Sequence, residues 1–172
     1  MPKFNLLQWR STIAFLILAT GLTGLVGTLT RLGTLPLARD IDYSSAQAPF
    51  IGIWLGAAIL IGMVLPFLGI WVWRGDRQIR TILGFYLFVL IVQIITEQAL
   101  SAFWFPSLVA VTGMIYTLFR VAQLWQARQQ VLRTTPPGQP SRRRFVRFLW
   151  ILLVFWSLNL LVLLTISLPA IV

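Results

Sequence analysis

The sequence predicts an all-α, polytopic integral membrane protein with five transmembrane helices, and three observations lead to this fold class. Apolar residues make up 58% of the chain and charged residues only 10%, a balance that the surface of a water-soluble domain does not allow. The apolar residues form runs of roughly 20 residues, which is the length that crosses a bilayer as a helix. The charges stand between these runs, as anchors at a membrane surface do. We therefore expect residues 1–172 to form one transmembrane helical domain.

The chain contains no cysteine and no histidine. It therefore lacks the usual ligands of zinc, haem and iron–sulfur clusters, and also the commonest acid–base side chain. We expect no metal site, no cofactor and no catalytic residue. A net charge of +10 would point to nucleic acid in a soluble protein. Because the charges here flank apolar runs, we expect contact with the lipid bilayer and no nucleic acid.

The first two helices are expected at residues 11–30 and 50–73. The first apolar run is too long for a signal peptide, so we expect it to span the membrane uncleaved. The second helix begins with a G-x-x-x-G pattern at Gly52 and Gly56, a spacing that lets another helix approach closely. Pro66 removes one helical hydrogen bond, so we expect a bend in the second half of this helix.

Helices three and four are expected at residues 81–102 and 106–125, as a hairpin. The sequence Phe103-Trp104-Phe105-Pro106 separates the two runs. Aromatic side chains are enriched at membrane–water interfaces. Proline is tolerated at a helix start because its missing N–H would lack a partner there anyway. The break therefore predicts a turn at the membrane surface.

Residues 126–146 are polar and cationic and contain several prolines, so we expect a flexible, extended basic loop. A fifth helix is expected at residues 147–168. Four arginines next to this helix are candidates for contact with anionic lipid headgroups, which attract basic residues by about 1 kcal/mol each. They are Arg142, Arg143, Arg144 and Arg147.

The distribution of basic residues predicts the orientation, because cytoplasmic segments carry an excess of Lys and Arg. With five spans, one side has only Arg31 and Arg39. The other side has twelve: Lys3, Arg10, Arg74, Arg77, Arg80, Arg120, Arg128, Arg133, Arg142, Arg143, Arg144 and Arg147. We expect the N-terminus in the cytoplasm and the C-terminus on the opposite side. Small size, charge bias and the lack of a cleavable signal favour a bacterial inner or thylakoid membrane.

Polar residues interrupt three of the expected helices. Tyr86, Gln93 and Glu97 share one face of helix three, because their spacings are seven and four. A second stripe repeats every four residues on helix four: Thr112, Tyr116 and Arg120. We expect the two stripes to face each other. Asn159 of helix five is expected to anchor a hydrogen bond between helices.

Glu97 is the one acid within the apolar runs. Counted from Arg80, it lies about 25 Å along the helix, near the outer boundary of a hydrocarbon layer of about 30 Å. Arg120 is expected near the inner surface, so we reject a direct pair and expect Arg31 or Arg39 as the partner of Glu97. Three roles stay open for this carboxylate: fixing helix packing, binding a ligand or proton, and contacting lipid headgroups.

Three function classes remain. We expect a non-catalytic accessory, scaffold or assembly subunit of a larger membrane complex, because eight tryptophans and small-residue helix faces favour contact with other membrane protein subunits. One alternative is a small transporter or channel lined by the stripe on helix three, although the chain has no internal repeat. The other is a membrane-embedded enzyme acting on a lipid. Its remaining acids, Asp40, Asp42 and Asp76, would lie on both sides of the membrane.

Overall fold

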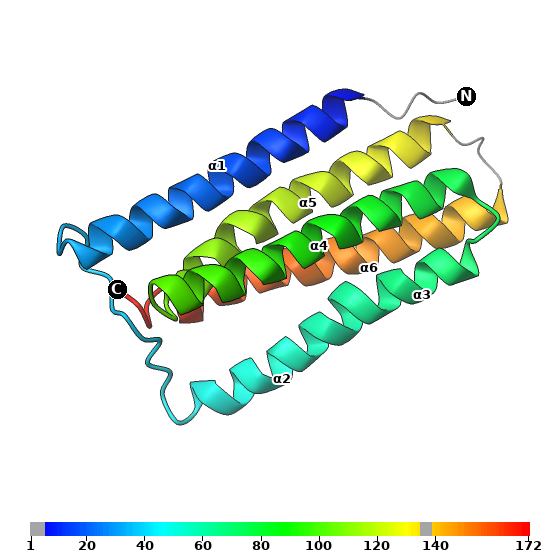
Figure 1. Cartoon of the computed structure of the whole chain (residues 1–172). Coiled ribbons are helices and arrows are strands. Elements are labelled where there is room, and N and C mark those ends of the chain that lie inside the picture. The colour runs from blue at the N-terminus through cyan, green and yellow to red at the C-terminus, as the bar shows by residue number, and fades with distance from the viewer. Residues whose placement is uncertain (1–5, 135–138) are drawn as a thin grey trace.

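The computed structural model describes residues 6–134 and 139–172, with side chains from Thr12 onward. In these ranges the regular structure is helical, without strands, and forms five rods long and apolar enough to cross a membrane (Figure 1). Three rods are single helices: α1 (Leu6–Arg31), α4 (Arg77–Phe103) and α5 (Leu108–Thr134). Two rods are composite. One joins α2 (Gln47–Ile59), the π-helical turn η1 (Leu60–Val64) and α3 (Leu65–Val72), and the other joins α6 (Pro140–Val162) and the π-helical turn η2 (Leu163–Ser167).

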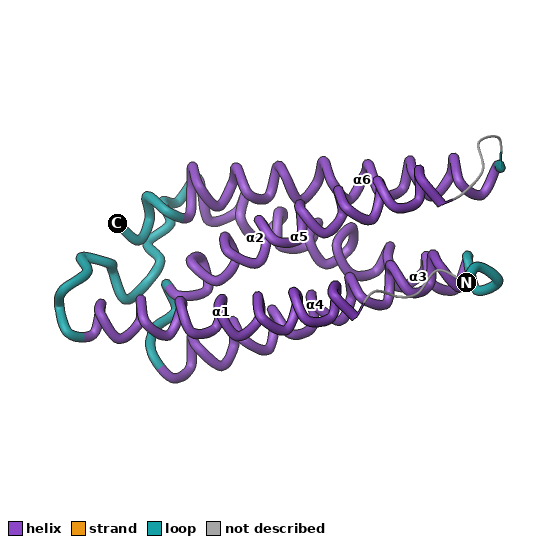
Figure 2. The backbone as a smooth tube through the Cα atoms, turned by 90° about the horizontal axis from the view of Figure 1, so that it is seen from above, coloured by secondary structure: helices purple, strands orange, loops and turns teal. Residues whose placement is uncertain are grey.

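The centre of the bundle is formed by α4, α5 and α6. α5 packs along both α4 and α6, α1 covers α5 and α4, and the rod containing η1 and α3 packs on α6 and α4. The connections gather at two ends of the bundle (Figure 2). The end that holds residues 73–76 is called the basic end below. The opposite end holds residues 32–46, residues 104–107 and the C-terminus, where the backbone N–H of Ala38 donates to the carbonyl of Ile171 at 2.8 Å.

Local sequence explains where several helices begin and end. Asp76 caps α4, because its Oδ1 accepts hydrogen bonds from two backbone N–H groups of the first turn at 3.0 and 3.1 Å. α1 is closed by Gly33, whose φ of +75° suits glycine, and the N–H of Thr34 donates back to the carbonyl of Leu29 at 3.0 Å. Pro140 occupies the first turn of α6, where a missing N–H costs nothing.

α5 and α6 are longer than expected from sequence. The predicted loop is wrong for residues 126–134 and 140–146, which are helical, while residues 135–138 lie outside the described residues. The prediction equates polar composition with a loop. Helices at a surface are polar on one side, however, and only a stripe of apolar residues is needed to bury the other side.

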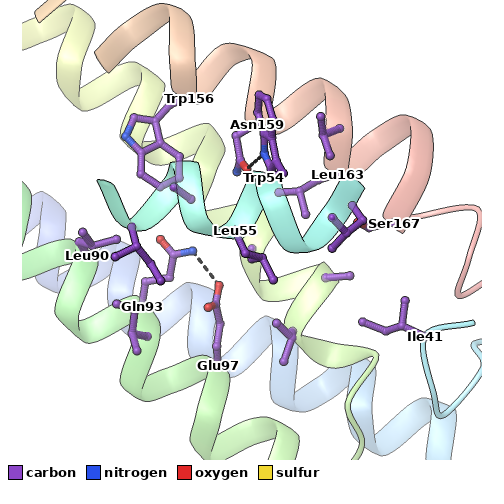
Figure 3. A pocket seen from close by; sticks show the side chains of 18 of the residues that line it. Ile41, Trp54, Leu55, Leu90, Gln93, Glu97, Trp156, Asn159, Leu163 and Ser167 are labelled. Atoms are coloured by element: carbon purple, nitrogen blue, oxygen red, sulfur yellow. Dashed lines mark hydrogen bonds between the residues drawn. The ribbon is translucent and has the colours of Figure 1, made fainter. Parts of the chain in front are cut away.

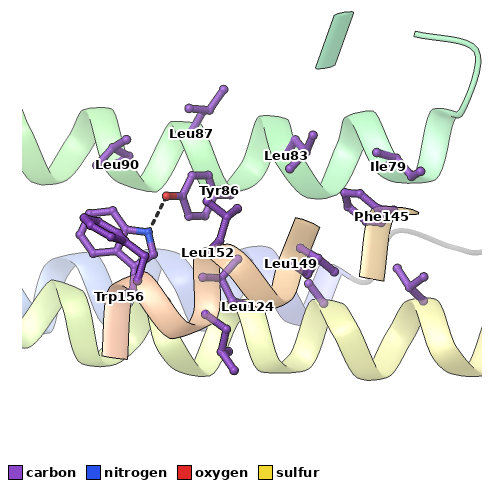
Figure 4. Close-up of a cluster of buried hydrophobic side chains, with 14 residues drawn as sticks. Ile79, Leu83, Tyr86, Leu87, Leu90, Leu124, Phe145, Leu149, Leu152 and Trp156 are labelled. Carbon is purple, nitrogen blue, oxygen red and sulfur yellow. Dashed lines mark hydrogen bonds between the residues drawn. The ribbon is translucent and has the colours of Figure 1, made fainter. Parts of the chain in front are cut away.

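Such a stripe continues both helices toward the basic end. Leu124, Ala127 and Val131 of α5 are buried at helical spacing, and Phe145 and Leu149 of α6 are buried in the same core. Figure 4 shows Leu124, Phe145 and Leu149 in this core, facing side chains of α4. The half of the bundle toward the basic end is therefore filled with side chains.

The second rod contains a π-helical turn at the place where the sequence predicts a bend. η1 lies just ahead of Pro66, whose missing N–H deprives the carbonyl of Gly62, four residues earlier, of its usual helical donor. Tyr86 of α4 replaces it, since its hydroxyl donates to Gly62 O at 2.7 Å. Trp156 of α6 donates in turn from Nε1 to the Tyr86 hydroxyl at 2.7 Å (Figure 4). Side chains from two other rods thus fix η1.

Replacing Gly62 by alanine tests this packing. A Cβ atom at Gly62 would lie 2.6 Å from Cζ2 of Trp156, which is too close for van der Waals contact. We expect Gly62→Ala to lower the free energy of unfolding by about 1–3 kcal/mol, the usual cost of overpacking, and to lower the melting temperature of the purified protein in detergent.

Gly52→Ala is the matched control, because an added Cβ there meets no atom within 4 Å. Its melting temperature should equal or slightly exceed that of the wild type, since alanine favours helix more than glycine does. A Gly62→Ala protein as stable as this control would contradict a rigid contact with Trp156.

Candidate functional site

Arg120 is fully buried and lies near the middle of α5, with an exposed fraction of 0%. At 1.5 Å per residue it is about 18 Å along the helix from Leu108 and about 21 Å from Thr134. From sequence, Arg120 is expected near the inner surface, because the helix is expected to end at residue 125. The helix end at residue 125 is wrong, since α5 continues for more than two further turns, which puts Arg120 in the middle of the helix instead of near its end.

The guanidinium of Arg120 is linked to a carboxylate on α4 through one amide. Its Nη2 donates a hydrogen bond to Oε1 of Gln93. The amide nitrogen of Gln93 donates to Oε1 of Glu97, one turn further along α4, at 2.7 Å (Figure 3). Gln93 can relay between the two charges because its amide accepts at one atom and donates at the other. The polar residues of α4 and α5 meet at this point.

Two aromatic rings complete the surroundings of Arg120. Its Cζ lies 4.3 Å from the ring centroid of Trp156 and 5.2 Å from that of Tyr86, within the range of cation–π attraction. Nε and Nη1 of Arg120 have no hydrogen-bond partner among the described residues. A buried charge without a direct ionic partner is costly. The two rings and the relay to Glu97 therefore supply its stabilisation.

The arginines expected to pair with Glu97 are not its partners in the structure. Arg31 and Arg39 are exposed and line a different cavity, at the opposite end of the bundle. Glu97 accepts its hydrogen bond from Gln93, and the cation that acts on it electrostatically is Arg120. The expectation fails because it depends on the misplaced end of the fourth helix, which puts Arg120 at the wrong depth.

A cavity of about 440 Å³ lies beside the relay, between α2, α4, α5 and α6. Its walls are mostly apolar. Gln93 and Glu97 project into it from α4, and Trp54 and Asn159 lie on the side formed by α2 and α6 (Figure 3). The cavity exists because α2 diverges from α4 on the far side of η1 (Figure 1). This volume, with a few polar groups in apolar walls, is typical of sites for small molecules.

Asn159 connects three rods at the edge of this cavity. Its Oδ1 accepts from Nε1 of Trp54 at 2.8 Å, and its Nδ2 donates to Oγ1 of Thr117 at 3.1 Å. Trp54 also stacks on Phe155, with ring centroids 5.3 Å apart. These contacts hold α2 to α6 even though α2 has left the centre of the bundle.

Two other residues singled out from sequence lie away from the cavity. Thr112 and Tyr116 are fully buried. Tyr116 makes an edge-to-face contact with Phe15 of α1 at 5.5 Å, and its hydroxyl lies 3.4 Å from Oγ1 of Thr96. Oγ1 of Thr112 has no hydrogen-bond partner in the described part of the chain. Tyr116 therefore serves the packing of α1, and neither residue lines the cavity.

The arginines at the start of α6 fall into two groups. Arg142 is half-buried, and its Nη2 donates to the carbonyl of Leu132 in the last turns of α5 at 3.0 Å. It thereby satisfies a carbonyl that has no partner within its own helix end. The other three, Arg143, Arg144 and Arg147, are exposed to the surroundings.

Several aromatic contacts were not foreseen from sequence. Trp156 and Trp54 contribute to the site, and the guanidinium of Arg128 lies 5.2 Å from the ring of Trp125 and 4.9 Å from that of Trp150. Most of these contacts join different helices, so no spacing within one helix marks them; the exception is Trp125 with Arg128, which lie three residues apart on α5. The number of tryptophans, eight, is the one sequence signal that could have drawn attention to them.

The acids do not converge on one place. Asp76 caps α4 at the basic end, Asp40 and Asp42 are exposed near the opposite end, and Glu97 lies at the cavity. Within the described ranges, no group of three or more acidic, histidine or cysteine side chains could hold a metal ion. The cavity thus offers one carboxylate together with amide and hydroxyl groups that can form hydrogen bonds.

A double-mutant cycle can test the charge balance between Arg120 and Glu97. Arg120→Met leaves the half-buried carboxylate of Glu97 without its cation and should lower the free energy of unfolding, by up to about 3–5 kcal/mol, the cost of breaking a buried ion pair. Glu97→Gln leaves the charge of Arg120 uncompensated and should also lower the free energy of unfolding. The double variant keeps neither charge, so we expect a coupling energy of about 0.5–3 kcal/mol in unfolding experiments in detergent.

Arg128→Met provides the control for this cycle, because Arg128 contacts two tryptophan rings and is not linked to Glu97. Its effect and that of Glu97→Gln should add without coupling. Additive effects of Arg120→Met and Glu97→Gln would show that the relay through Gln93 does not balance the two charges.

The site joins parts of the chain that are far apart in sequence. The relay and the ring of Tyr86 come from α4 and α5, and the rings of Trp54 and Trp156 and the amide of Asn159 come from α2 and α6. A pattern within any one helix therefore describes only part of it. Comparison with protein-family models, with curated proteins and with solved structures finds no match to this chain.

Proposed function

We propose that the five rods cross a membrane as a multi-pass bundle, in a bacterial inner or thylakoid membrane. The shortest candidate span has 20 residues, which as a helix measures about 30 Å and matches the hydrocarbon layer. Large apolar side chains on the outside of the rods support insertion, because lipid would cover them. Examples are Ile17, Ile53, Leu118 and Leu161, which are exposed.

The arginines support an orientation with the N-terminus in the cytoplasm and the C-terminus on the opposite side. With Arg120 inside the bundle, ten arginines of the described residues still belong by connectivity to the basic end, against Arg31 and Arg39 at the opposite end. Such an excess marks the cytoplasmic side. Three exposed arginines of the basic end, Arg143, Arg144 and Arg147, would then contact anionic lipid headgroups.

We further propose that the protein is a non-catalytic accessory subunit of a larger membrane complex. The surface of α2 carries this proposal. No residue of α2 is buried, and an added Cβ at Gly52 or Gly56 would meet no atom within 4 Å. Two glycines four residues apart form a strip along which a second helix can approach closely. The occupant that we propose is a transmembrane helix of another subunit.

The central network supports a static rather than a transporting role. The polar groups of Tyr86 and Gln93 are engaged with Gly62, Trp156, Arg120 and Glu97. A permeation path along this stripe would require these buried groups to exchange their partners for water or solute. An enzyme acting on a lipid receives less support still, since Glu97 is the one carboxylate among the described residues that line the cavity, and Asp76 caps α4 at the basic end.

The orientation can be tested with single cysteines, because the natural chain has none. Gly75→Cys lies in the connection between α3 and α4, and Ser45→Cys lies between α1 and α2. We expect a membrane-impermeant maleimide to label Ser45→Cys in intact cells, and to label Gly75→Cys only after the membrane is opened. The reverse pattern would invert the orientation, and labelling of both in intact cells would contradict a membrane crossing by the rod between them, Gln47–Val72.

The partner contact can be tested by photocrosslinking in the native membrane. A benzophenone side chain at Ile53, which is exposed beside Gly52, should crosslink to another membrane-spanning protein. Gly52→Leu with Gly56→Leu should abolish this product while leaving the melting temperature unchanged, since both positions are open. Gly84→Leu is the matched control, because an added Cβ at Gly84 also meets no atom within 4 Å, but Gly84 lies on α4. Crosslinks to lipid alone, or to a second copy of this chain, would contradict the accessory role.

A further inference from the structure

We propose that the cavity between α2, α4, α5 and α6 binds one uncharged, lipid-like molecule whose head group carries a hydroxyl. This inference rests on the membrane insertion proposed above. It does not rest on the partner helix, because Gly52 and Gly56 are not among the residues that line the cavity. The two faces of α2 can therefore be tested separately.

The size and walls of the cavity suit an apolar body. Its volume of about 440 Å³ lies within the range of about 300–1,000 Å³ found for small-molecule sites. Each of the surrounding rods contributes apolar side chains to the walls, among them Leu90, Val109, Val162 and Leu163. For a molecule that comes from hydrocarbon, a space of this kind is stabilising mainly through close van der Waals contact with the walls.

The cavity opens sideways, toward the apolar outside of the bundle. Leu55 and Ile59 of α2 and Ile94 of α4 line the cavity, yet their exposed fractions are 58%, 56% and 40%. They therefore form a rim between α2 and α4 through which the interior communicates with the surroundings. In a membrane these surroundings are hydrocarbon. The molecule that enters is thus one that already resides in the bilayer.

Glu97 determines what the head group must offer. Its Oε1 is engaged by the Gln93 amide, whereas its second oxygen accepts no hydrogen bond from the described residues. A carboxylate oxygen is an acceptor and requires a donor. The nearby amide of Asn159 is already engaged by Trp54 and Thr117. A hydroxyl on the bound molecule is the group that would complete the hydrogen bonding of Glu97.

The charge balance of the site determines that the head group is uncharged. The carboxylate of Glu97 is offset by the guanidinium of Arg120 through Gln93, so no net charge remains to neutralise an ion. A cationic or anionic head group would lose its hydration without gaining a counter-charge. A neutral alcohol loses little hydration and gains one hydrogen bond to a charged acceptor.

Photolabelling in vesicles can test this proposal on the whole chain. The purified protein is reconstituted with hexadecanol carrying a photoreactive diazirine in its chain, or with the same chain ending in a carboxylate or a trimethylammonium group. We expect the alcohol to label peptides of α2, α4 and α6 that line the cavity, and unlabelled hexadecanol to compete. Labelling by the charged chains should be about tenfold weaker at equal concentration.

Cavity-filling variants provide the second measurement. Ala58→Phe and Val109→Phe place a ring in the cavity from two different walls, and each should reduce labelling about tenfold. Ile53→Phe is the matched control, because Ile53 is on α2 but faces outward, and its labelling should equal that of the wild type. Equal labelling by all three chains would show that any lipid tail fills the space, and would overturn the role of the head group.

Two outcomes would overturn the site as a whole. One is labelling of the wild type that unlabelled hexadecanol cannot compete. The other is labelling by the alcohol that Ala58→Phe and Val109→Phe leave unchanged. Both results come from the protein alone in vesicles, so they are separate from the crosslink at Ile53, and insertion itself is checked by the cysteine labelling. The wild-type competition also decides the question if a filled variant fails to fold.

Discussion

The buried charge of Arg120 is the constraint on which the centre of the bundle depends. A guanidinium that has lost its water needs hydrogen-bond acceptors and aromatic faces around it, and here α4 and α6 supply them. Gln93 accepts from it, and the rings of Tyr86 and Trp156 lie over it. The hydroxyl of Tyr86 then continues to Gly62 O, the carbonyl left without its helical donor by the following proline. One set of polar contacts thereby joins α4, α5, α6 and the rod that contains η1. These contacts fix the positions of the four rods relative to one another around Arg120.

The two halves of the bundle differ because the second rod changes its course at η1. Toward the basic end, α3 packs on α4, and the core is filled by side chains such as Leu83 and Phe145. Toward the opposite end, α2 makes no comparable contact with α4, and its tie to the bundle is the hydrogen bond and ring stacking of Trp54. The same rod is therefore a packed element in one half and the wall of a cavity in the other. The π-helical turn η1 lies between the packed part of the rod, α3, and the part that lines the cavity, α2.

How much was predictable depends on whether a feature is local. Apolar run lengths predicted five helical spans, and the local signals at Asp76 and Pro140 are those that begin helices elsewhere. The predicted loop is wrong for residues 126–134 and 140–146, because a stripe of apolar residues such as Leu124, Ala127 and Val131 continues the helix among polar neighbours. Because the fourth helix is longer than predicted, Arg120 lies in its middle, and Glu97 is linked to Arg120 through Gln93 instead of to Arg31 or Arg39. The cavity could not be predicted, because it depends on the path of α2 relative to three other rods rather than on any pattern within one of them.

The amide between the two charges has a consequence that a direct ion pair would not have. A guanidinium bound in two-point contact with Glu97 would engage both carboxylate oxygens and leave none for another molecule. With Gln93 in between, the guanidinium of Arg120 stays against the rings of Tyr86 and Trp156. One carboxylate oxygen of Glu97 is then left without a hydrogen bond from the described residues, beside the cavity. Gly113 makes this placement possible, because a Cβ there would already be in contact with Oε1 of Glu97 at 3.5 Å, and a larger side chain would compete with the carboxylate for the same space. Gln93 and Gly113 therefore keep the guanidinium of Arg120, which joins the helices, apart from the second carboxylate oxygen of Glu97, which can accept a hydrogen bond from a bound molecule.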